Sequence, residues 1–255
     1  MASGFRPFYV QLLNTRTRQA IDDDAGVCNV LVAGSPVEVT IYSDAAGQVT
    51  ASNPLTFTNG VVSFWTADTV TSVDLSIMTS TGFAAFVTGL EESQHRVDIN
   101  PEARTQTLVV PFAPSNNVET DTGFDFPANC LLSPYGTHLR VITVDATEDI
   151  NVGILSSESG GDADGFIAIG SVATAGIVNL IPQITGGATI DYVSANFVGA
   201  LLATSIVGAD AVATVGGWTP KLYRTDGTAK SITYTGSTGS DTAAGYIYFT
   251  YTKLT

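Results

Sequence analysis

Residues suited to acid–base or nucleophilic chemistry are few in this chain, which contains two histidines among 255 residues. His95 lies in a polar run, residues 91–96, that we expect to form a loop, and His138 opens a predicted strand. A Ser-His-Asp triad needs a histidine between a nucleophile and a carboxylate. No Gly-x-Ser-x-Gly turn of the kind that presents a serine nucleophile occurs in the sequence. The sequence therefore predicts no catalytic residue and no enzymatic activity.

Adjacent carboxylates occur at residues 22–24, 91–92 and 148–149. Neighbouring residues of a strand point to opposite faces, so such runs rarely converge on one substrate. A depolymerase, which is the enzyme class we considered, needs carboxylates that converge in a groove. We therefore expect these three runs to be solvated surface charge.

The best candidate for a metal site is the loop at residues 158–165, where Asp162 and Asp164 precede Gly165. Carboxylates two residues apart with a following glycine suit Ca²⁺, but an EF-hand also needs a third loop carboxylate and a distal glutamate. Catalytic metals need clusters of His or Cys, and the Gly160-Gly161 pair lacks the lysine of a phosphate loop. We expect a glycine-rich hairpin loop, with no metal and no cofactor. Cation binding by the Asp162–Asp164 loop stays an open alternative.

The two cysteines, Cys28 and Cys130, lie in apolar runs that we assign to different domains. Buried free thiols are the expected state, with a disulfide between the domains as the alternative. Trp65, Trp218 and the nine tyrosines are expected to fill a β core or an interface, with a sugar-binding groove as the alternative.

Charge and hydropathy exclude two further classes of partner. The formal net charge is −14, from 24 acidic and 10 basic residues, so the chain repels a phosphate backbone and is not expected to bind nucleic acid. Residues 197–218 are long enough to span a bilayer but contain several glycines and Asp210. We predict two buried strands with a turn near residues 208–210, and no membrane contact. No signal peptide is expected, because no apolar core follows the first residues.

Strand patterns recur from end to end and predict an all-β protein. In the first half they cover residues 37–42, 61–65, 73–78 and 107–111, with turns at 44–47, 58–60 and 80–82. In the second half they cover residues 138–144, 151–155, 166–170 and 246–252. The last of these has aromatic residues on both faces, which indicates a central strand or a subunit contact. One turn of helix is expected near residues 171–175.

Loop-forming residues at 112–122 place the predicted domain boundary. We therefore predict two β-sandwich or barrel-like, jelly-roll-type domains, residues 1–114 and 115–255.

Five segments of the second half, residues 122–129, 144–147, 152–166, 229–235 and 241–248, carry a resemblance to a known group of proteins. In these segments the chain resembles bacteriophage capsid decoration, head-fibre and related virion proteins. The first half is similar to small β-sandwich modules of phage tail and head appendages at residues 39–44, 53–56 and 59–65.

The resemblance implies a structural protein of a tailed-phage virion that decorates or cements the capsid through protein–protein contacts. The implied partners are the major capsid protein or other virion proteins and copies of the chain itself, with a homotrimer favoured. The implied location is the virion, after assembly in the host cytoplasm. A tail or baseplate component and a receptor- or carbohydrate-binding module are the alternatives. We further expect residues 3–13, with Phe5, Phe8 and Tyr9, to anchor the protein, so that their deletion abolishes shell binding without unfolding the rest.

Overall fold

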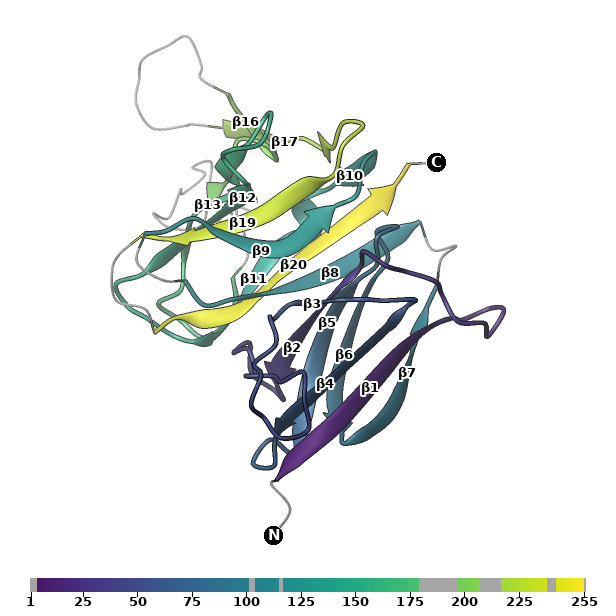
Figure 1. The fold of residues 1–255 in the computed structure, drawn as a ribbon. Coiled ribbons are helices and arrows are strands. Elements are labelled where there is room, and N and C mark those ends of the chain that lie inside the picture. The colour runs from purple at the N-terminus through teal and green to yellow at the C-terminus, as the bar shows by residue number, and fades with distance from the viewer. Residues whose placement is uncertain are drawn as a thin grey trace. The chain divides into compact units, whose positions relative to one another are not determined.

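The computed structural model describes residues 4–100, 104–114, 117–178, 197–206, 217–237 and 242–254. Apart from one short helical segment, the regular elements of these residues are all strands, which confirms the predicted all-β class (Figure 1). The one helical segment among them is a 3₁₀ turn, η1 (Pro134–Gly136). The chain divides into two compact units, Met1–Val110 and Pro111–Thr255.

The first unit contains two β-sheets. One has the order β4-β1-β7 and the other the order β3-β2-β5-β6. All neighbours are antiparallel except β1 and β7, which are parallel. The bounds are β1 (Phe5–Asn14), β2 (Val27–Val32), β3 (Leu55–Thr56), β4 (Val61–Ala67), β5 (Ser72–Met78), β6 (Ala84–Glu91) and β7 (Ser93–Ile99).

Side chains from both sheets make one apolar core. Phe8 of β1 stacks on Phe64 of β4 with ring centroids 5.1 Å apart, and both belong to the same buried cluster as Val30 of β2 and Leu75 of β5. Two sheets that share a core in this way form a sandwich, as predicted for this part of the chain.

Residues 91–96 were expected to be a loop, and that expectation is wrong. β6 ends at Glu91 and β7 begins at Ser93, so the chain passes from one sheet to the other at Glu92. The charged side chains of this segment are compatible with a strand because its outward positions are exposed while Val97 and Ile99 are buried. Polarity alone therefore misidentified an edge strand as a loop.

The strand predicted at residues 37–42 is also wrong as a regular element. Glu38 and Tyr42 make only isolated bridges, to Leu31 and to Thr50 and Trp65. The side chain of Asn53 lies between this segment and β2, where its amide nitrogen donates to the carbonyls of Val30 and Val39. The side chain of Asn53 thus takes hydrogen-bonding positions that backbone groups would use in a continuous ladder. Val39 and Ile41 are nevertheless buried.

Three predicted turns of the first unit are present. At 44–47 the carboxylate of Asp44 accepts hydrogen bonds from the amides of Ala46, Gln48 and Val49. At 58–60 both Asn59 and Gly60 have positive φ, as a type I′ turn requires. At 80–82 the amide of Gly82 donates to the carbonyl of Thr79.

The strand predicted at residues 73–78 is present as β5, and its side chains are buried on both faces. Its polar residues Asp74 and Ser76 are buried because each has a backbone partner. Asp74 accepts from the amides of Gly34 and Gly89 at 2.8 and 2.7 Å, and Ser76 donates to the carbonyl of Val109.

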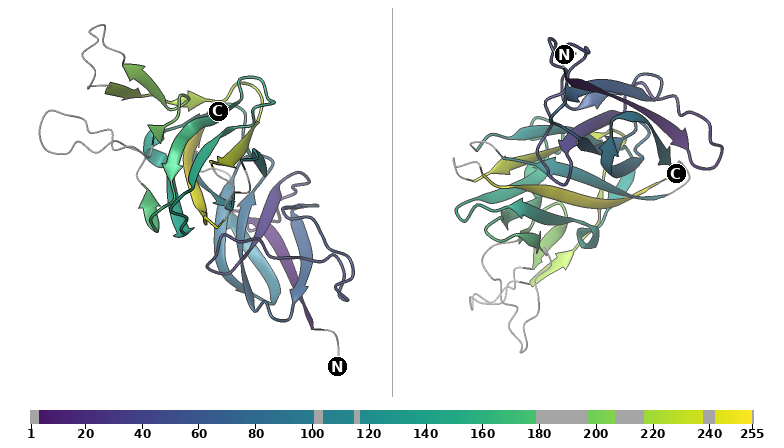
Figure 2. Two further views of the ribbon diagram at one scale, coloured as in Figure 1. Left: turned by 90° about the vertical axis from the view of Figure 1, so that its left-hand side faces the viewer. Right: turned by 90° about the horizontal axis from the view of Figure 1, so that it is seen from below.

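The second unit contains two larger sheets and a strand pair. The orders are β14-β11-β20-β10-β18, with β8 also pairing with β20, then β15-β13-β12-β19-β9, and β16-β17. Figure 2 shows β20, in yellow, lying among strands from the middle of the chain. The bounds are β8 (Thr105–Phe112), β9 (Thr120–Phe126), β10 (Cys130–Leu132), β11 (His138–Thr143), β12 (Asp149–Ile154), β13 (Asp162–Ser171), β14 (Gly176–Val178), β15 (Phe197–Val198), β16 (Ala203–Ile206), β17 (Gly217–Pro220), β18 (Tyr223–Arg224), β19 (Lys230–Gly236) and β20 (Ala244–Lys253).

The core of the second unit lies between its two large sheets and is aromatic. The ring of Phe126 on β9 meets Phe166 of β13 and Phe249 of β20 edge-on, with centroids 5.5 and 5.0 Å away. β20 has neighbours on both edges, so of the two predicted roles for residues 246–252 the central strand is confirmed. Its inward residues Ile247, Phe249 and Tyr251 are fully buried.

Several local predictions in the second unit differ from the structure. Simple alternation would place Thr143 on the face of Leu139 and Val141, which are buried, but Thr143 is exposed because the register shifts after Val141. Residues 173–175 form bends and not a helical turn. β16 and β17 form an antiparallel pair that overlaps residues 197–218, where two buried strands were predicted. The burial of their side chains and the expected turn at 208–210 lie outside the described part of the structure. No helix in the described part of the chain is long and apolar enough to cross a membrane.

The division between the units falls inside β8, close to the loop at 112–122 that we expected to mark the boundary. Val109 accepts the hydrogen bond from Ser76 in the first unit, and the ring of Phe112 lies against Gly245 in the second. One strand therefore contributes to both units.

Candidate functional site

The two histidines are placed in different units, and each ring is held by contacts with its neighbours. His95 is on β7, where its ring stacks on Phe8 and its Nε2 donates to the carbonyl of Glu91. His138 opens β11 as predicted, and its ring lies flat on that of Tyr248 with centroids 4.6 Å apart. Burial lowers the pKa of His138. Ser93 Oγ lies 3.4 Å from Nε2 of His95, two residues away on the same strand, and the stacking contacts orient both histidine rings.

Two of the three acidic runs contain a buried carboxylate, contrary to the expectation of solvated charge. Asp23 is buried and accepts from the amides of Ala25, Gly26 and Ser80 at 3.2, 2.9 and 2.9 Å. Burial by itself would raise the pKa of Asp23, but these hydrogen bonds outweigh it and the pKa is lowered.

Glu148 is the second buried carboxylate and accepts a short hydrogen bond from the amide of Ser237. Both buried acids follow or precede turns, where unpaired amides need acceptors. Glu91 and Glu92 are exposed, as predicted for that run.

The glycine-rich loop is shorter than expected because β13 begins at Asp162. Four residues of β13, 163–166, lie between the pairs Val152↔Ile167 and Ile154↔Asp162, opposite the single residue Gly153 of β12. Gly153 approaches β13 so closely that an added Cβ would lie 1.8 Å from the carbonyl oxygen of Asp162. Burial and then the neighbouring Asp164 raise the pKa of Asp162. Within the described residues, no group of three or more His, Cys, Asp or Glu side chains is placed to hold a metal.

The remaining charged side chains around this loop hold its backbone. Glu158 accepts from the amide of Ser231 at 3.2 Å, and Glu119 accepts from the amide of Ser156 at 2.8 Å. The buried Lys230 donates to the carbonyl of Ser159 at 2.8 Å and lies 3.3 Å from Asp226. Glu119, Glu158 and Lys230 therefore hold this loop and the residues just before it through hydrogen bonds that the spacing of residues in the sequence did not reveal.

Cys28 and Cys130 are buried free thiols in different units, which confirms the expected state. Burial raises the pKa of both, that of Cys130 to about 11, so neither is a thiolate nucleophile near neutral pH. Trp65 is a partly buried residue of β4. Trp218 lies on β17, and its side chain lies outside the described part of the structure.

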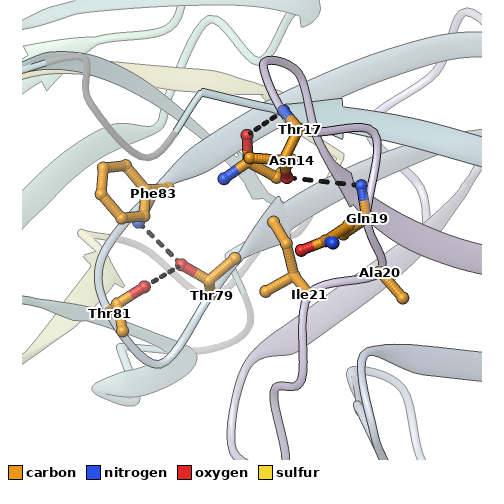
Figure 3. Close-up of a pocket in the computed structure, with 8 residues that line it drawn as sticks. All are labelled: Asn14, Thr17, Gln19, Ala20, Ile21, Thr79, Thr81 and Phe83. Carbon is orange, nitrogen blue, oxygen red and sulfur yellow. Dashed lines mark hydrogen bonds between the residues drawn. The ribbon is translucent and has the colours of Figure 1, made fainter.

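A hollow of about 380 Å³ lies in the first unit between the loop after β1 and the turn after β5 (Figure 3). Amide and hydroxyl groups of Asn14, Gln19 and Thr81 line it, together with the ring of Phe83 and the side chain of Ile21. Thr79 also lines the hollow and is fixed in place, because its Oγ1 accepts a hydrogen bond from the amide of Phe83 at 2.9 Å. The lining residues carry no formal charge, which suits a small neutral ligand and supplies no acid or base.

The amino-terminal strand is part of the first core and is not a free anchor. β1 is the middle strand of its sheet, and Phe8, Val10 and Leu12 are buried in the cluster that unites both sheets. The expectation that residues 3–13 can be removed without unfolding the rest is therefore wrong. The apolar start of the chain is explained by alternation, since Tyr9 is exposed between two buried residues.

The most distinctive surface of the second unit is the outer face of its six-stranded sheet. Arg140 on β11 stands opposite Ile177 of β14 and Tyr246 of β20, and His138 stands opposite Tyr248. Directly opposed residues share a face. Tyr246 is buried, whereas Arg140 is exposed and Ile177 is 65% exposed. We call His138, Arg140, Ile177 and Tyr248 the outer face.

Sequence reasoning missed this outer face, although one signal for it exists. The alternation His138-Leu139-Arg140-Val141 places His138 and Arg140 on one side of a strand. The partners Ile177 and Tyr248 come from distant segments, so only the strand order brings them beside Arg140. The chain matches no family model, no curated protein and no solved structure.

Proposed function

We propose that this chain is a non-enzymatic structural subunit of a tailed-phage virion that decorates or cements the capsid through protein–protein contacts. The observation that carries the proposal is where the segments that resemble virion proteins lie. Residues 122–126, 152–154, 162–166 and 230–235 fall on β9, β12, β13 and β19, which are consecutive neighbours in one sheet. Residues 244–248 fall on β20, whose Phe249 meets Phe126 across the core.

The arrangement of these segments supports a shared fold as the source of the resemblance. Segments that are scattered over the sequence form one hydrogen-bonded framework with a common aromatic core, as expected when a fold constrains them jointly. A likeness carried by framework residues bears on architecture more than on chemistry. It fits a protein whose role is mechanical.

The use of buried charge supports the same role. Asp23, Glu148 and Lys230 each bond to backbone groups of turns or loops. Hydrogen bonds of charged groups to backbone are stronger than those between neutral groups. Turns fixed in this way stiffen a β scaffold, which suits a protein that has to persist on a particle outside a cell.

Immunogold electron microscopy of virions produced by the genome that encodes this chain tests the proposal. Antibodies against the chain are expected to label the head. Labelling of the tail or baseplate instead would favour the alternative location. Virions that contain no copies of the chain, by mass spectrometry of the purified particles, would contradict a structural role. An antibody preadsorbed with the purified chain serves as the control.

A binding module is the second candidate function, and the uncharged hollow of the first unit is the observation that favours it. The exposed amide of Gln19 and hydroxyl of Thr81 are groups that hydrogen-bond to the hydroxyls of a neutral sugar. Saturable binding of a neutral glycan, lost on Gln19→Ala or Thr81→Ala and retained by Val49→Ala, would support it. If the chain binds none of the glycans on an array of neutral glycans, this candidate function is excluded.

A further inference from the structure

We propose that β7 pairs edge to edge with β7 of a second copy of this chain, antiparallel and in the register that places Arg96 of each copy opposite Asp98 of the other. β7 lies at the end of the sheet order β4-β1-β7, so within the described residues one of its edges has no partner strand (Figure 1). The unpaired amides and carbonyls of such an edge are a template for another strand. This pairing is independent of the proposed function, since it needs only a second copy of the chain.

The other terminal strands of the larger sheets are short, interrupted or already bonded. β3, β15 and β18 have two residues each, and β14 has three. β9 bonds two of its amides to its own side chains, those of Asp121 and Thr122, and the ladder of β6 is interrupted near Gly89, which has positive φ. β4 and β8 bond to groups outside their sheets, those of Tyr42 and Ser76. By contrast, β7 pairs with β1 over its whole length without a register shift.

The two faces of β7 limit the registers in which it can pair with itself. Gln94, Arg96 and Asp98 are exposed on one face, whereas Val97 and Ile99 are buried on the face that meets the core. A register offset by one residue would bring the exposed face of one copy onto the core side of the other. The two-fold axis of the pair therefore passes through a residue of β7 and not between two residues.

Charge selects among the registers that remain. An axis through Val97 places Arg96 opposite Asp98 of the second copy, and the two-fold symmetry repeats this pair. An axis through Arg96 or Asp98 would set that residue directly opposite itself, and an axis through His95 would set Asp98 opposite Glu92. Like charges directly opposite each other destabilise a strand pair, whereas opposite charges stabilise it.

The side chains that this register brings together are able to meet. Arg96 is exposed and takes part in none of the ion pairs formed among the described residues. Asp98 Oδ2 accepts a hydrogen bond from Arg18 of its own chain at 2.7 Å, but a carboxylate has a second acceptor oxygen for another guanidinium. On the core face the register brings together the Val97 side chains of the two copies, so the apolar core continues into the contact.

The contact is one strand wide, so it is smaller than a standard interface of about 1,600 Å². Two copies that each carry a net charge of −14 also repel each other over a distance. We therefore expect pairing at high protein concentration, where it doubles the mass of the assembly that is present at low concentration. A trimer would be joined to a second trimer in this way.

Sedimentation velocity of the full chain at physiological salt, over a rising series of protein concentrations, tests the pairing. The wild type is expected to double in mass as the concentration rises. Arg96→Asp and Asp98→Arg each place two like-charge pairs in the contact and are expected to raise the dissociation constant about tenfold or more. The double variant with both exchanges restores the opposite charges and the net charge of −14, and is expected to pair like the wild type.

Val49→Asp is the control for added charge, because Val49 is 56% exposed and lies outside β7. It is expected to pair like the wild type, and circular dichroism verifies that every variant is folded. An equal mixture of the two single variants is expected to pair, since each supplies the charge that the other lacks. No doubling at any concentration, doubling that persists in the single variants, or a folded double variant that does not pair would each overturn the pairing. None of these results bears on the proposed function, which depends on contacts with the shell.

Discussion

At the scale of single residues, this protein uses its buried polar side chains to complete the hydrogen bonding of turns. Asp23, Asp74 and Glu148 each accept hydrogen bonds from backbone amides that belong to other segments. A buried amide without an acceptor costs about 1–3 kcal/mol, so these carboxylates have a clear energetic role. None of these long-range pairings follows from sequence spacing, because each partner lies on another strand or turn.

Asp23→Ala is expected to lower the free energy of unfolding by about 3 kcal/mol, since it removes the acceptor of three amides. Urea denaturation at neutral pH measures this loss. Asp22→Ala is the control, because Asp22 is the exposed neighbour in the same run. A loss of similar size for both variants would contradict the assigned role of Asp23.

The pH dependence of stability follows from the lowered pKa of Asp23 in the folded chain. A group with a lower pKa in the folded than in the unfolded state contributes stability that is present above the unfolded pKa and is lost as pH falls through the folded one. Wild-type stability is therefore expected to drop faster than that of Asp23→Ala as the pH falls below about 4. Parallel decline of the two proteins in acid urea titrations would argue against this contribution.

At the scale of elements, alternation of apolar residues predicted most strands and failed where another interaction intervened. The pattern at 37–42 buries Val39 and Ile41 as expected, but the amide of Asn53 interrupts the ladder beside them. The charged residues at 91–96 led to the prediction of a loop at the start of β7, which is an edge strand with exposed outward side chains. The alternation of apolar residues thus predicted which side chains are buried more reliably than it predicted which backbone groups pair.

β1 offers a direct test of alternation, because two neighbouring aromatic residues lie on opposite faces. Phe8→Ala is expected to cost about 3–5 kcal/mol of stability, since Phe8 is 1% exposed and stacks on Phe64. Tyr9→Ala is expected to cost under about 1 kcal/mol, because Tyr9 is 37% exposed. Thermal unfolding monitored by circular dichroism compares the two. Equal losses would show that β1 does not bury its alternate residues as the structure has them.

At the scale of the whole molecule, assembly is the property that the proposed function requires. A homotrimer has three times the 26.5 kDa of one chain. Light scattering of the purified chain at physiological salt is expected to give that mass, because the resemblance to capsid decoration proteins implies that copies of the chain associate. The trimer should persist on dilution to the micromolar range if its contacts are of the usual size for stable interfaces.

A monomeric mass would contradict the expected trimer and favour the binding-module alternative. Measurement at low and high salt separates two causes of a monomer. Repulsion between copies that each carry a net charge of −14 weakens with added salt, whereas a missing interface does not form at any salt concentration.

The sequence by itself determined the fold class, the buried faces of most strands, the turns and the state of the cysteines. These properties depend on local patterns, such as the period of two in a strand or the positive φ of Asn59-Gly60. The tertiary structure decided which carboxylates are buried, where β1 packs and which side chains surround Arg140. Those properties depend on strand order, and strand order joins residues such as Arg140, Ile177 and Tyr248 that no short-range pattern connects.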